Sequence, residues 1–169
     1  MISRDYCILM AKYNRWQNMQ LERVLQTLDK DELMKERGAF FGSIFKTINH
    51  LCWGDQMWMG RFDGGPAPEG GIMGSVELFP TLATWSAERF QLDGRIRLWA
   101  EKVHNVELAG TLTWYSGAAG REVTKPMGVV VTHFFNHQTH HRGQVHAMLT
   151  AAGAKTEDTD LFLMDDMLN

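Results

Sequence analysis

The sequence predicts an all-α protein: an up-down four-helix bundle with a small β-hairpin between the third and fourth helices and a short C-terminal helix. Four long segments carry apolar residues at helical spacing, and none of them contains an internal proline. No strands alternate with these segments, so a parallel sheet is not expected. A chain of 169 residues with 44% hydrophobic residues suits a single domain over residues 1–169.

The first predicted helix covers residues 2–28, where apolar side chains recur at helical spacing without an intervening glycine or proline. Its Tyr6, Tyr13 and Trp16 are interpreted as core residues, because bulky side chains at this spacing fill a bundle. A strip that stacks on a ligand is the alternative interpretation of the same three residues. Residues 29–42 are expected to form a polar connection to the second helix.

The second predicted helix runs from residue 43 to residue 61, with Ser43 as its N-cap. It is apolar over much of its girth, which predicts a central position in the bundle. Residues 63–74 are rich in glycine and proline, and we expect them to form an irregular surface loop.

The third helix is predicted over residues 81–104, directly after Pro80. Its weak point is Asp93-Gly94, because both residues have low helix propensity. His104 lies near the predicted end of this helix, where a charged imidazole would complement the helix dipole. We therefore interpret His104 as a structural residue rather than a catalytic one.

A β-hairpin is predicted next, because residues 111–115 and 121–124 are β-prone and the glycine-containing segment 116–120 supplies a turn. Pro126 then opens the fourth helix, which is predicted over residues 127–152.

The fourth helix is expected to end at Gly153, a residue type that commonly follows the last helical turn. A polar turn comes next, and residues 160–168 are predicted to form the short C-terminal helix. Internal repeats, linkers and low-complexity segments are not recognised anywhere in the sequence.

Composition argues against several classes of partner. The net charge is −3 and the basic residues are scattered, so a nucleic-acid partner is not expected. No stretch approaches the roughly twenty apolar residues that span a bilayer, and a signal peptide is not recognised, so no membrane partner is expected. Cys7 and Cys52 are far apart and form no paired motif. The simplest expectation is a cytoplasmic protein with reduced thiols.

Five of the seven histidines fall in the predicted fourth helix. His137 and His141 lie one turn apart on its apolar stripe, so both imidazoles are expected to point into the core. Such a pair can hold a metal ion, and the alternative is that each is a core histidine with a hydrogen-bonding neighbour. His133 and His140 lie on the flank of the stripe, and His146 points away from it.

A third ligand is expected from the second helix, whose one histidine is His50. Gly54 follows one turn later and leaves room beside the imidazole for a ligand or a close helix contact. Cys52 points nearly opposite to His50, and Asp55 faces elsewhere on an ideal helix. The expected site therefore consists of His50 and the histidine pair on the fourth helix.

The chain resembles the DinB/YfiT-like family of helical-bundle metalloproteins over nearly its whole length. The most specific motif is the His-x-x-x-His-Arg-Gly-Gln run that starts at His137, combined with His50 far earlier in the chain. The matching residues are Tyr13-Asn14-x-Trp16, Phe40-Phe41-Gly42-Ser43-Ile44, Asn49-His50-Leu51-x-x-Gly54-Asp55, Thr132-His133-Phe134-x-Asn136-His137-Gln138-Thr139-His140-His141-Arg142-Gly143-Gln144, and Gly153 with Asp158-Thr159-Asp160-Leu161.

The resemblance implies a four-helix bundle, commonly dimeric, in which three histidines hold a divalent metal ion. On this sequence the ligands would be His50, His137 and His141, with His133 as the reserve if the helical register is misjudged. Three imidazoles accept several metals, of which Zn and Ni are the expected ones. We also expect a homodimer with an apolar helical interface.

In this family, characterised members include transferases that use low-molecular-weight thiols such as bacillithiol or mycothiol, and a maleylpyruvate isomerase. The resemblance therefore implies a metal-dependent, thiol S-transferase-like enzyme acting on a small electrophile. The alternatives are a non-catalytic metal-binding stress-response protein and a metal-dependent hydrolase. A catalytic site should open into a cavity lined by tryptophans such as Trp53. Protons should compete with the metal below a pH of about 6.5, the pKa of free imidazole.

Overall fold

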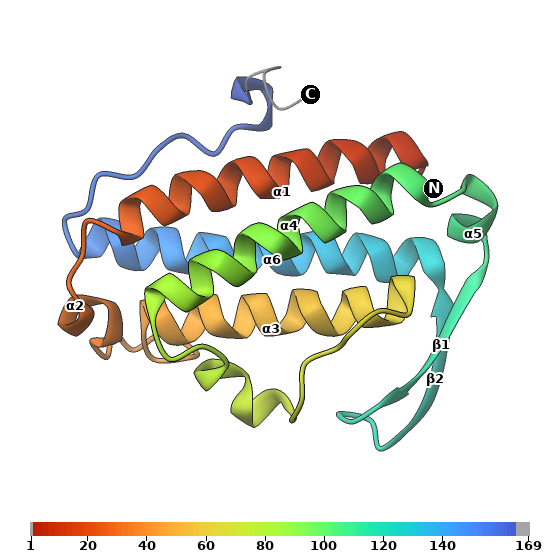
Figure 1. Ribbon diagram of the computed structural model, residues 1–169, viewed down its shortest axis with the longest axis horizontal. Coiled ribbons are helices and arrows are strands. Elements are labelled where there is room, and N and C mark those ends of the chain that lie inside the picture. The colour runs from red at the N-terminus through yellow and green to blue at the C-terminus, as the bar shows by residue number, and fades with distance from the viewer. Residues whose placement is uncertain (1, 165–169) are drawn as a thin grey trace.

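Four long helices form the body of the protein in the computed structural model, which describes residues 2–164 (Figure 1). They are α1 (Arg4–Leu25), α3 (Ile44–Asp63), α4 (Leu82–Lys102) and α6 (Met127–Ala151). Helix α1 packs mainly on α4, and α3 packs on both α6 and α4. The predicted helical bundle is confirmed, and its core consists of the large apolar side chains on the facing sides of these helices.

Hydroxyl side chains begin three of the four long helices. Ser3 accepts a hydrogen bond from the backbone N–H of the third helical residue of α1, and Ser43 and Thr81 do the same for α3 and α4. These bonds satisfy N–H groups that have no partner within the helix. The prediction of Ser43 as an N-cap is therefore confirmed.

Helices α3 and α4 run in the same direction, so the order of helix directions is not strictly alternating (Figure 1). Trp85 near the start of α4 donates its indole N–H to the carbonyl of Ile48 near the start of α3 at 3.1 Å. Arg95, further along α4, binds Asp63 at the end of α3. Helices α3 and α4 can be parallel because the connection between them is long, and its 3₁₀ helix η1 (Ile72–Glu77) packs back along α3. Long crossovers of this kind occur in many helical bundles.

Two short helices lie where the sequence predicted none. Helix α2 (Lys30–Met34) interrupts the predicted polar connection, and Asp29 caps it. Helix α5 (Asn105–Ala109) follows α4, which ends two residues before His104. His104 therefore precedes a helix instead of ending one, and its predicted role at a helix C-terminus is wrong. The backbone N–H of His104 donates to Glu107 at 2.7 Å, which fixes the start of α5.

The predicted hairpin is present as strands β1 (Thr111–Ser116) and β2 (Arg121–Pro126), which pair antiparallel. Trp114 on β1 contacts Trp58 of α3, with the ring centroids 5.4 Å apart, so the hairpin is tied to the bundle. Pro126 directly precedes α6, and Gly153 follows the end of that helix with a φ of 79°, as predicted.

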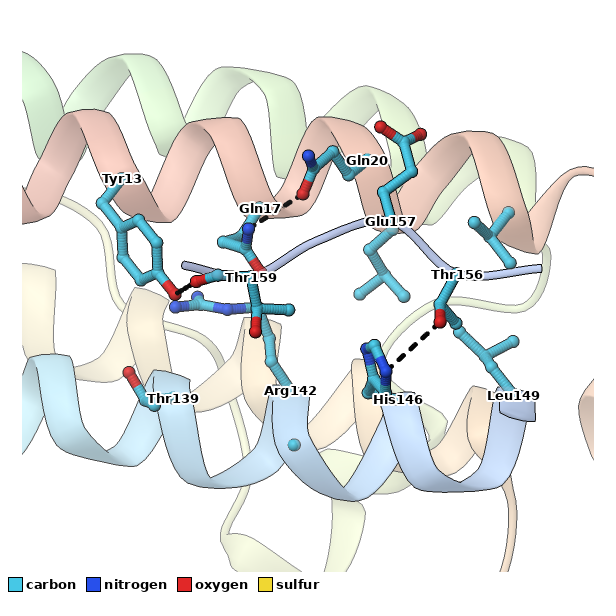
Figure 2. Close-up of a pocket in the computed structure, with 13 residues that line it drawn as sticks. Tyr13, Gln17, Gln20, Thr139, Arg142, His146, Leu149, Thr156, Glu157 and Thr159 are labelled. Atoms are coloured by element: carbon cyan, nitrogen blue, oxygen red, sulfur yellow. Dashed lines mark hydrogen bonds between the residues drawn. The ribbon is translucent and has the colours of Figure 1, made fainter. Parts of the chain in front are cut away.

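After α6 the chain folds back along α1 and α6 and borders a cavity between them (Figure 2). The hydroxyl of Tyr13 on α1 donates to the carbonyl of Thr159 at 2.6 Å and holds this segment in place. Leu161–Leu163 forms a short 3₁₀ helix, η2. The remainder of the predicted C-terminal helix, residues 165–168, lies outside the described residues.

None of the helices within residues 2–164 combines the length and the apolar character needed to cross a membrane. Both cysteines, Cys7 and Cys52, are buried and free. Burial raises the pKa of the Cys52 thiol to about 12, so this thiol is unreactive.

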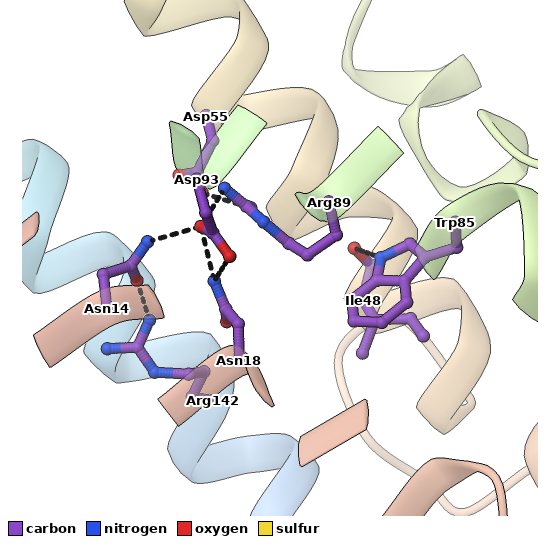
Figure 3. Close-up of polar contacts among 8 residues, drawn as sticks. All are labelled: Asn14, Asn18, Ile48, Asp55, Trp85, Arg89, Asp93 and Arg142. Atoms are coloured by element: carbon purple, nitrogen blue, oxygen red, sulfur yellow. Dashed lines mark hydrogen bonds and ion pairs between the residues drawn. The ribbon is translucent and has the colours of Figure 1, made fainter. Parts of the chain in front are cut away.

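A buried ion network joins the helices at the centre of the bundle (Figure 3). Arg89 of α4 lies between two carboxylates, 2.6 Å from Asp55 and 2.7 Å from Asp93, and all three side chains are at most 5% exposed. Burial opposes the charge on Arg89, but Asp93 and Asp55 outweigh it and raise the pKa of the guanidinium. Asn18 of α1 donates to both oxygens of Asp93. These bonds explain why α4 is unbroken at Asp93-Gly94, the weak point in the sequence.

Removing the cation from this network should destabilise the fold. Arg89→Met leaves Asp55 and Asp93 buried without a counter-charge, so we expect the free energy of unfolding to fall by about 3–5 kcal/mol. Urea denaturation monitored by circular dichroism measures the change. The matched control is Arg97→Met on the same helix, because Arg97 is 38% exposed and lies 3.8 Å from Glu101. The control should cost at most about 1 kcal/mol, and equal losses in the two variants would contradict a special role for Arg89.

Candidate metal centre

Three histidines that are distant in sequence come together between α3 and α6. His50 projects from α3, and His137 and His141 project from α6. One ring nitrogen from each lies within 4.8 Å of the other two, an arrangement that could hold a metal ion. His50 and His141 are buried and His137 is partly buried. The structure therefore brings together the three residues that the sequence predicted as a site.

The spacing of the nitrogens suits metal coordination. The Nε2 atoms of His137 and His141 are 3.1 Å apart. Two nitrogens bound to zinc at about 2.0–2.1 Å and at the tetrahedral angle would be separated by about 3.3–3.4 Å. A shift of a few tenths of an ångström is within reach of side-chain rotation, so the pair is close to a ligand arrangement.

The tautomer of His50 follows from its neighbour Ser75 in η1. The Nδ1 atom of His50 lies 2.8 Å from the hydroxyl oxygen of Ser75. That hydroxyl donates its one proton to the carbonyl of Ile72 at 2.6 Å, so toward His50 it can only accept. His50 is therefore protonated at Nδ1, and its Nε2 atom presents a bare lone pair to the cluster.

His141 is oriented in the same way by the residue one turn later. Its Nδ1 atom lies 2.8 Å from the side-chain oxygen of Gln144, which is an acceptor. The Nε2 atom of His141 is therefore also unprotonated and faces the cluster. Both bonds resemble the outer hydrogen bonds that set the ring orientation and the tautomer of metal-ligating histidines.

His137 completes an arrangement that favours a cation. Its Nδ1 atom is buried and has no hydrogen-bond partner among residues 2–164. Its Nε2 atom faces the bare Nε2 of His141 and lies beside the ring of His50, whose centroid is 5.4 Å from its own. Because the proton of His141 is on Nδ1, the proton between these two Nε2 atoms belongs to His137, which donates to His141. A cation bound at this point would take the place of that shared proton. The residues present therefore fit a bound metal ion.

The place of His137 depends on a glycine in the facing helix. A Cβ atom on Gly54 would lie 3.0 Å from Cε1 of His137, which is closer than ordinary packing allows. The space that the sequence predicted beside His50 is thus occupied by an imidazole from α6. Gly54 permits close helix contact at the point where the two halves of the site meet.

Aromatic side chains enclose the cluster. Phe41 stacks on the His50 ring with a centroid distance of 4.0 Å, and it also contacts His141 at 5.5 Å. Trp53 stacks against His50 at 6.0 Å. The indole N–H of Trp53 is buried without a hydrogen-bond partner in the described part of the chain. These walls cover part of the cluster and leave one unused donor nearby.

Sequence reasoning missed Ser75, Gln144 and Phe41 as parts of the site. Gln144 follows His141 by three positions on one helix, so helical spacing alone contained this signal. Ser75 comes from an irregular connection whose path over α3 has no periodic pattern, so no comparable signal exists for it. Phe41 precedes α3 and was noticed only as part of a matching motif.

The remaining candidates lie outside the cluster. His133 is exposed and packs on Trp58. Its ring centroid lies 5.8 Å from that of His137, so it is a neighbour of the cluster and not one of the three converging ligands. His146 contacts Thr156 on the opposite side of α6, as its predicted direction requires. Asp55 is held by Arg89 in the buried ion network, away from the histidines.

Burial keeps the cluster uncharged. It lowers the pKa of His50 to about 4 and that of His137 to about 3, and neighbouring imidazoles add to both effects. The pKa of His141 is lowered as well, mainly by burial. The free-imidazole pKa used in the sequence argument is therefore too high for the folded protein. All three rings are neutral, as metal ligands must be, down to a lower pH than expected.

Comparison with known proteins places this fold and cluster in a family. A model of the DinB family matches residues 1–167. The chain belongs to the DinB family. Protein DinB of Bacillus subtilis (strain 168) is 26% identical over 160 residues, which cover 92% of this chain and 91% of that protein. The resemblance seen in the sequence is confirmed, and family membership together with the three-histidine cluster fits a metal-binding helical protein.

The depressed histidine pKa values predict how stability depends on pH. Unfolded imidazoles take up protons near a pH of about 6.5, whereas the folded cluster stays neutral. In metal-free protein, the free energy of unfolding should therefore be highest above that pH and should fall as pH drops toward 4. Urea denaturation in chelator at several pH values measures the slope.

Variants assign this slope to the cluster. His137→Leu should reduce the pH dependence by about one proton, because His137 has the most depressed pKa of the three. His104→Leu removes an exposed histidine outside the cluster and serves as the control. If the two variants and the unmodified protein share one slope, the buried imidazoles do not govern acid stability.

Proposed function

We propose that this DinB-family protein binds one divalent metal ion, Zn or Ni, through His50, His137 and His141. We further propose that it uses this centre to transfer a low-molecular-weight thiol to a small electrophile. The observation that carries the proposal is the convergence of the three rings, two of which are fixed with Nε2 free by Ser75 and Gln144.

Three neutral imidazoles leave the double positive charge of a bound ion undiminished and a coordination position open, so the ion would supply a Lewis acid that lowers the pKa of a thiol. Ser75 and Gln144 hold the rings in place before the ion arrives. Phe41 and Trp53, which stack on His50, offer apolar surface to an electrophile. The unused indole N–H of Trp53 is available to a polar atom of a substrate.

Thiol transfer is supported over metal-dependent hydrolysis by the position of the carboxylate that follows His50 on α3. Hydrolysis of this type generally uses a carboxylate or similar group to position and deprotonate water. Asp55, the carboxylate closest in sequence to His50, is buried in its ion pair with Arg89. A thiol that is already acidified needs no such group.

A non-catalytic metal-binding protein is the second candidate, and one observation favours it. The protein has a cavity between α1 and α6 and another beside α2, and the linings of both lack all three histidines. An ion at the cluster would also join α3 to α6 and thereby stabilise the bundle. Under this alternative, the ion contributes to folding and the protein has no turnover.

Metal analysis of protein purified without an affinity tag is the first test. We expect about one divalent ion per chain, and a sharp loss of metal in His50→Ala, His137→Ala and His141→Ala, because two imidazoles bind an ion far more weakly than three. Ser75→Ala should keep the ligands but weaken affinity by about 10–100-fold. His146→Ala, on the opposite side of α6, is the matched control.

Retention of the metal in His50→Ala would overturn the three-ligand assignment. Turnover is then measured with bacillithiol or mycothiol and a chromogenic electrophile. Metal-dependent consumption of the thiol that is lost in His50→Ala supports the transferase. Full metal binding without turnover, together with unfolding on metal removal, supports the non-catalytic alternative.

We also propose that the protein is a homodimer. The sequence suggested a dimer because α3 is apolar on more than one side. In the structure those sides are covered within the chain by α4, α6 and η1. Support comes instead from α1 and α4, which pack together and expose Leu9, Phe90 and Leu98 at 42%, 67% and 49%. Exposed apolar residues on adjacent helices are typical of dimer interfaces.

Light scattering should give twice the monomer mass at micromolar concentration, because an apolar interface of this kind persists on dilution. Phe90→Glu places a charge on the proposed interface and should shift the mass to that of the monomer. Val106→Glu alters another exposed apolar residue, on α5, and should leave the dimer intact. A monomer mass for the unmodified protein would exclude this arrangement.

A cytoplasmic location is proposed from the two cysteines, which are buried, free and well separated in sequence. Free thiols suit a reducing compartment. Fractionation of cells that produce the full chain, with detection by antibody, tests this directly; recovery outside the cytoplasmic fraction would contradict it.

A further inference from the structure

A second potential binding site lies on the other side of α6 from the histidine cluster. An open cavity of about 260 Å³ lies between α1, α6 and the segment that follows α6 (Figure 2). Arg142, His146 and Leu149 line it from α6, whereas His137 and His141 face α3. Adjacent residues His141 and Arg142 thus belong to two separate sites.

Arg142 brings a buried positive charge to this cavity. Its side chain is 8% exposed, reaches from α6 toward α1 and lies over the ring of Tyr13 at 5.7 Å (Figure 2). One Nη atom donates to the side-chain oxygen of Asn14, which is a neutral acceptor. Within residues 2–164, no carboxylate lies within ion-pair distance of Arg142. The charge therefore has no direct counter-ion among the residues that the structure describes.

The nearest carboxylates are already engaged. Asp93, linked to Arg142 through Asn14, is bound by Arg89. Glu157 lines the cavity at its rim, but both of its oxygens accept hydrogen bonds from Arg23, at 2.8 and 3.0 Å. A buried guanidinium with unused N–H groups is stabilised by an anion that enters the cavity.

The two ends of the cavity differ in character. Tyr13, Thr139 and Arg142 lie at one end, and Leu149 lies toward the other, beside His146 and Thr156, which are paired with each other (Figure 2). Leu21 and Val24, two to three turns after Tyr13 on α1, continue the apolar end. A ligand that fits both ends has an anionic head and a short apolar tail.

The segment after α6 borders the cavity and makes polar contacts along its length. Thr156 contacts Nε2 of His146 at 3.2 Å, and the carbonyl of Thr159 accepts the hydrogen bond from Tyr13. The carbonyl of Asp158 accepts a longer bond, 3.4 Å, from Gln17. These few contacts hold the segment as one wall of the cavity, which stays open to a ligand on another side.

We propose that this cavity binds a small organic carboxylate with an apolar tail, its carboxylate on Arg142 and its tail against Leu21, Val24 and Leu149. The volume lies just below the range of drug-sized pockets, about 300–1,000 Å³, which restricts the ligand to a short chain. A planar guanidinium matches a carboxylate through paired hydrogen bonds. The site is distinct from the metal centre and independent of its chemistry.

The probe is sodium octanoate, titrated into the metal-loaded protein by calorimetry, with octan-1-ol and inorganic phosphate as separate arms. Octanoate should bind at one site per chain. Octan-1-ol lacks the charge and phosphate lacks the tail, so each should bind about tenfold more weakly or worse. Equal binding of octan-1-ol would overturn the role of Arg142, and binding of phosphate alone would overturn the role of the apolar end.

Variants locate the binding. Leu21→Trp fills the apolar end from a partly buried position and should abolish octanoate binding, whereas Val106→Trp on the surface of α5, outside both the cavity and the proposed dimer interface, is the control. His50→Ala with His141→Ala removes the proposed metal ligands and should leave octanoate binding intact, so failure of the metal proposal does not affect this test. Loss of binding in that double variant, or its survival in Leu21→Trp, would overturn the proposal.

Discussion

The buried ion network around Arg89 fixes how the helices face one another, and the histidine cluster depends on that arrangement. Asp55 lies five residues after His50 on α3, and Arg142, which joins the network through Asn14, directly follows His141 on α6. Each half of the metal centre is thus anchored next to a residue of the network. Groups of this kind must satisfy one another when buried, so helix registers that separate them are strongly disfavoured.

The cluster is organised before any ion binds. Ser75 and Gln144 assign the proton of two rings to Nδ1, and burial keeps the rings neutral. The packing of α3 on α6, which Gly54 allows to be close, holds the three rings against one another. Preorganisation of this kind means that binding an ion requires little rearrangement of the protein.

Much of this arrangement could be predicted from sequence because helices repeat regularly. The directions of His137 and His141, and of His50 on α3, follow from 100° per residue. The features that were not predicted lie in segments whose sequence has no regular spacing of apolar residues. Ser75 lies in a connection whose course no pattern specifies, and that same connection makes α3 and α4 parallel. His104 was assigned to the wrong helix, since the boundary between α4 and α5 is set by a local hydrogen bond with Glu107.

The His-Arg-Gly-Gln run on α6 divides its residues between two faces of one helix. His141 and Gln144 serve the cluster beside α3, while Arg142 serves the ion network and the cavity beside α1. A Cβ atom added to Gly143 would have no described atom within 4 Å, so packing among the described residues does not require glycine there. Because successive residues of a helix point about 100° apart, adjacent residues can serve opposite faces of α6. The compact motif thereby contributes to the proposed metal centre and to the proposed carboxylate site from a single turn, while the two sites stay separate.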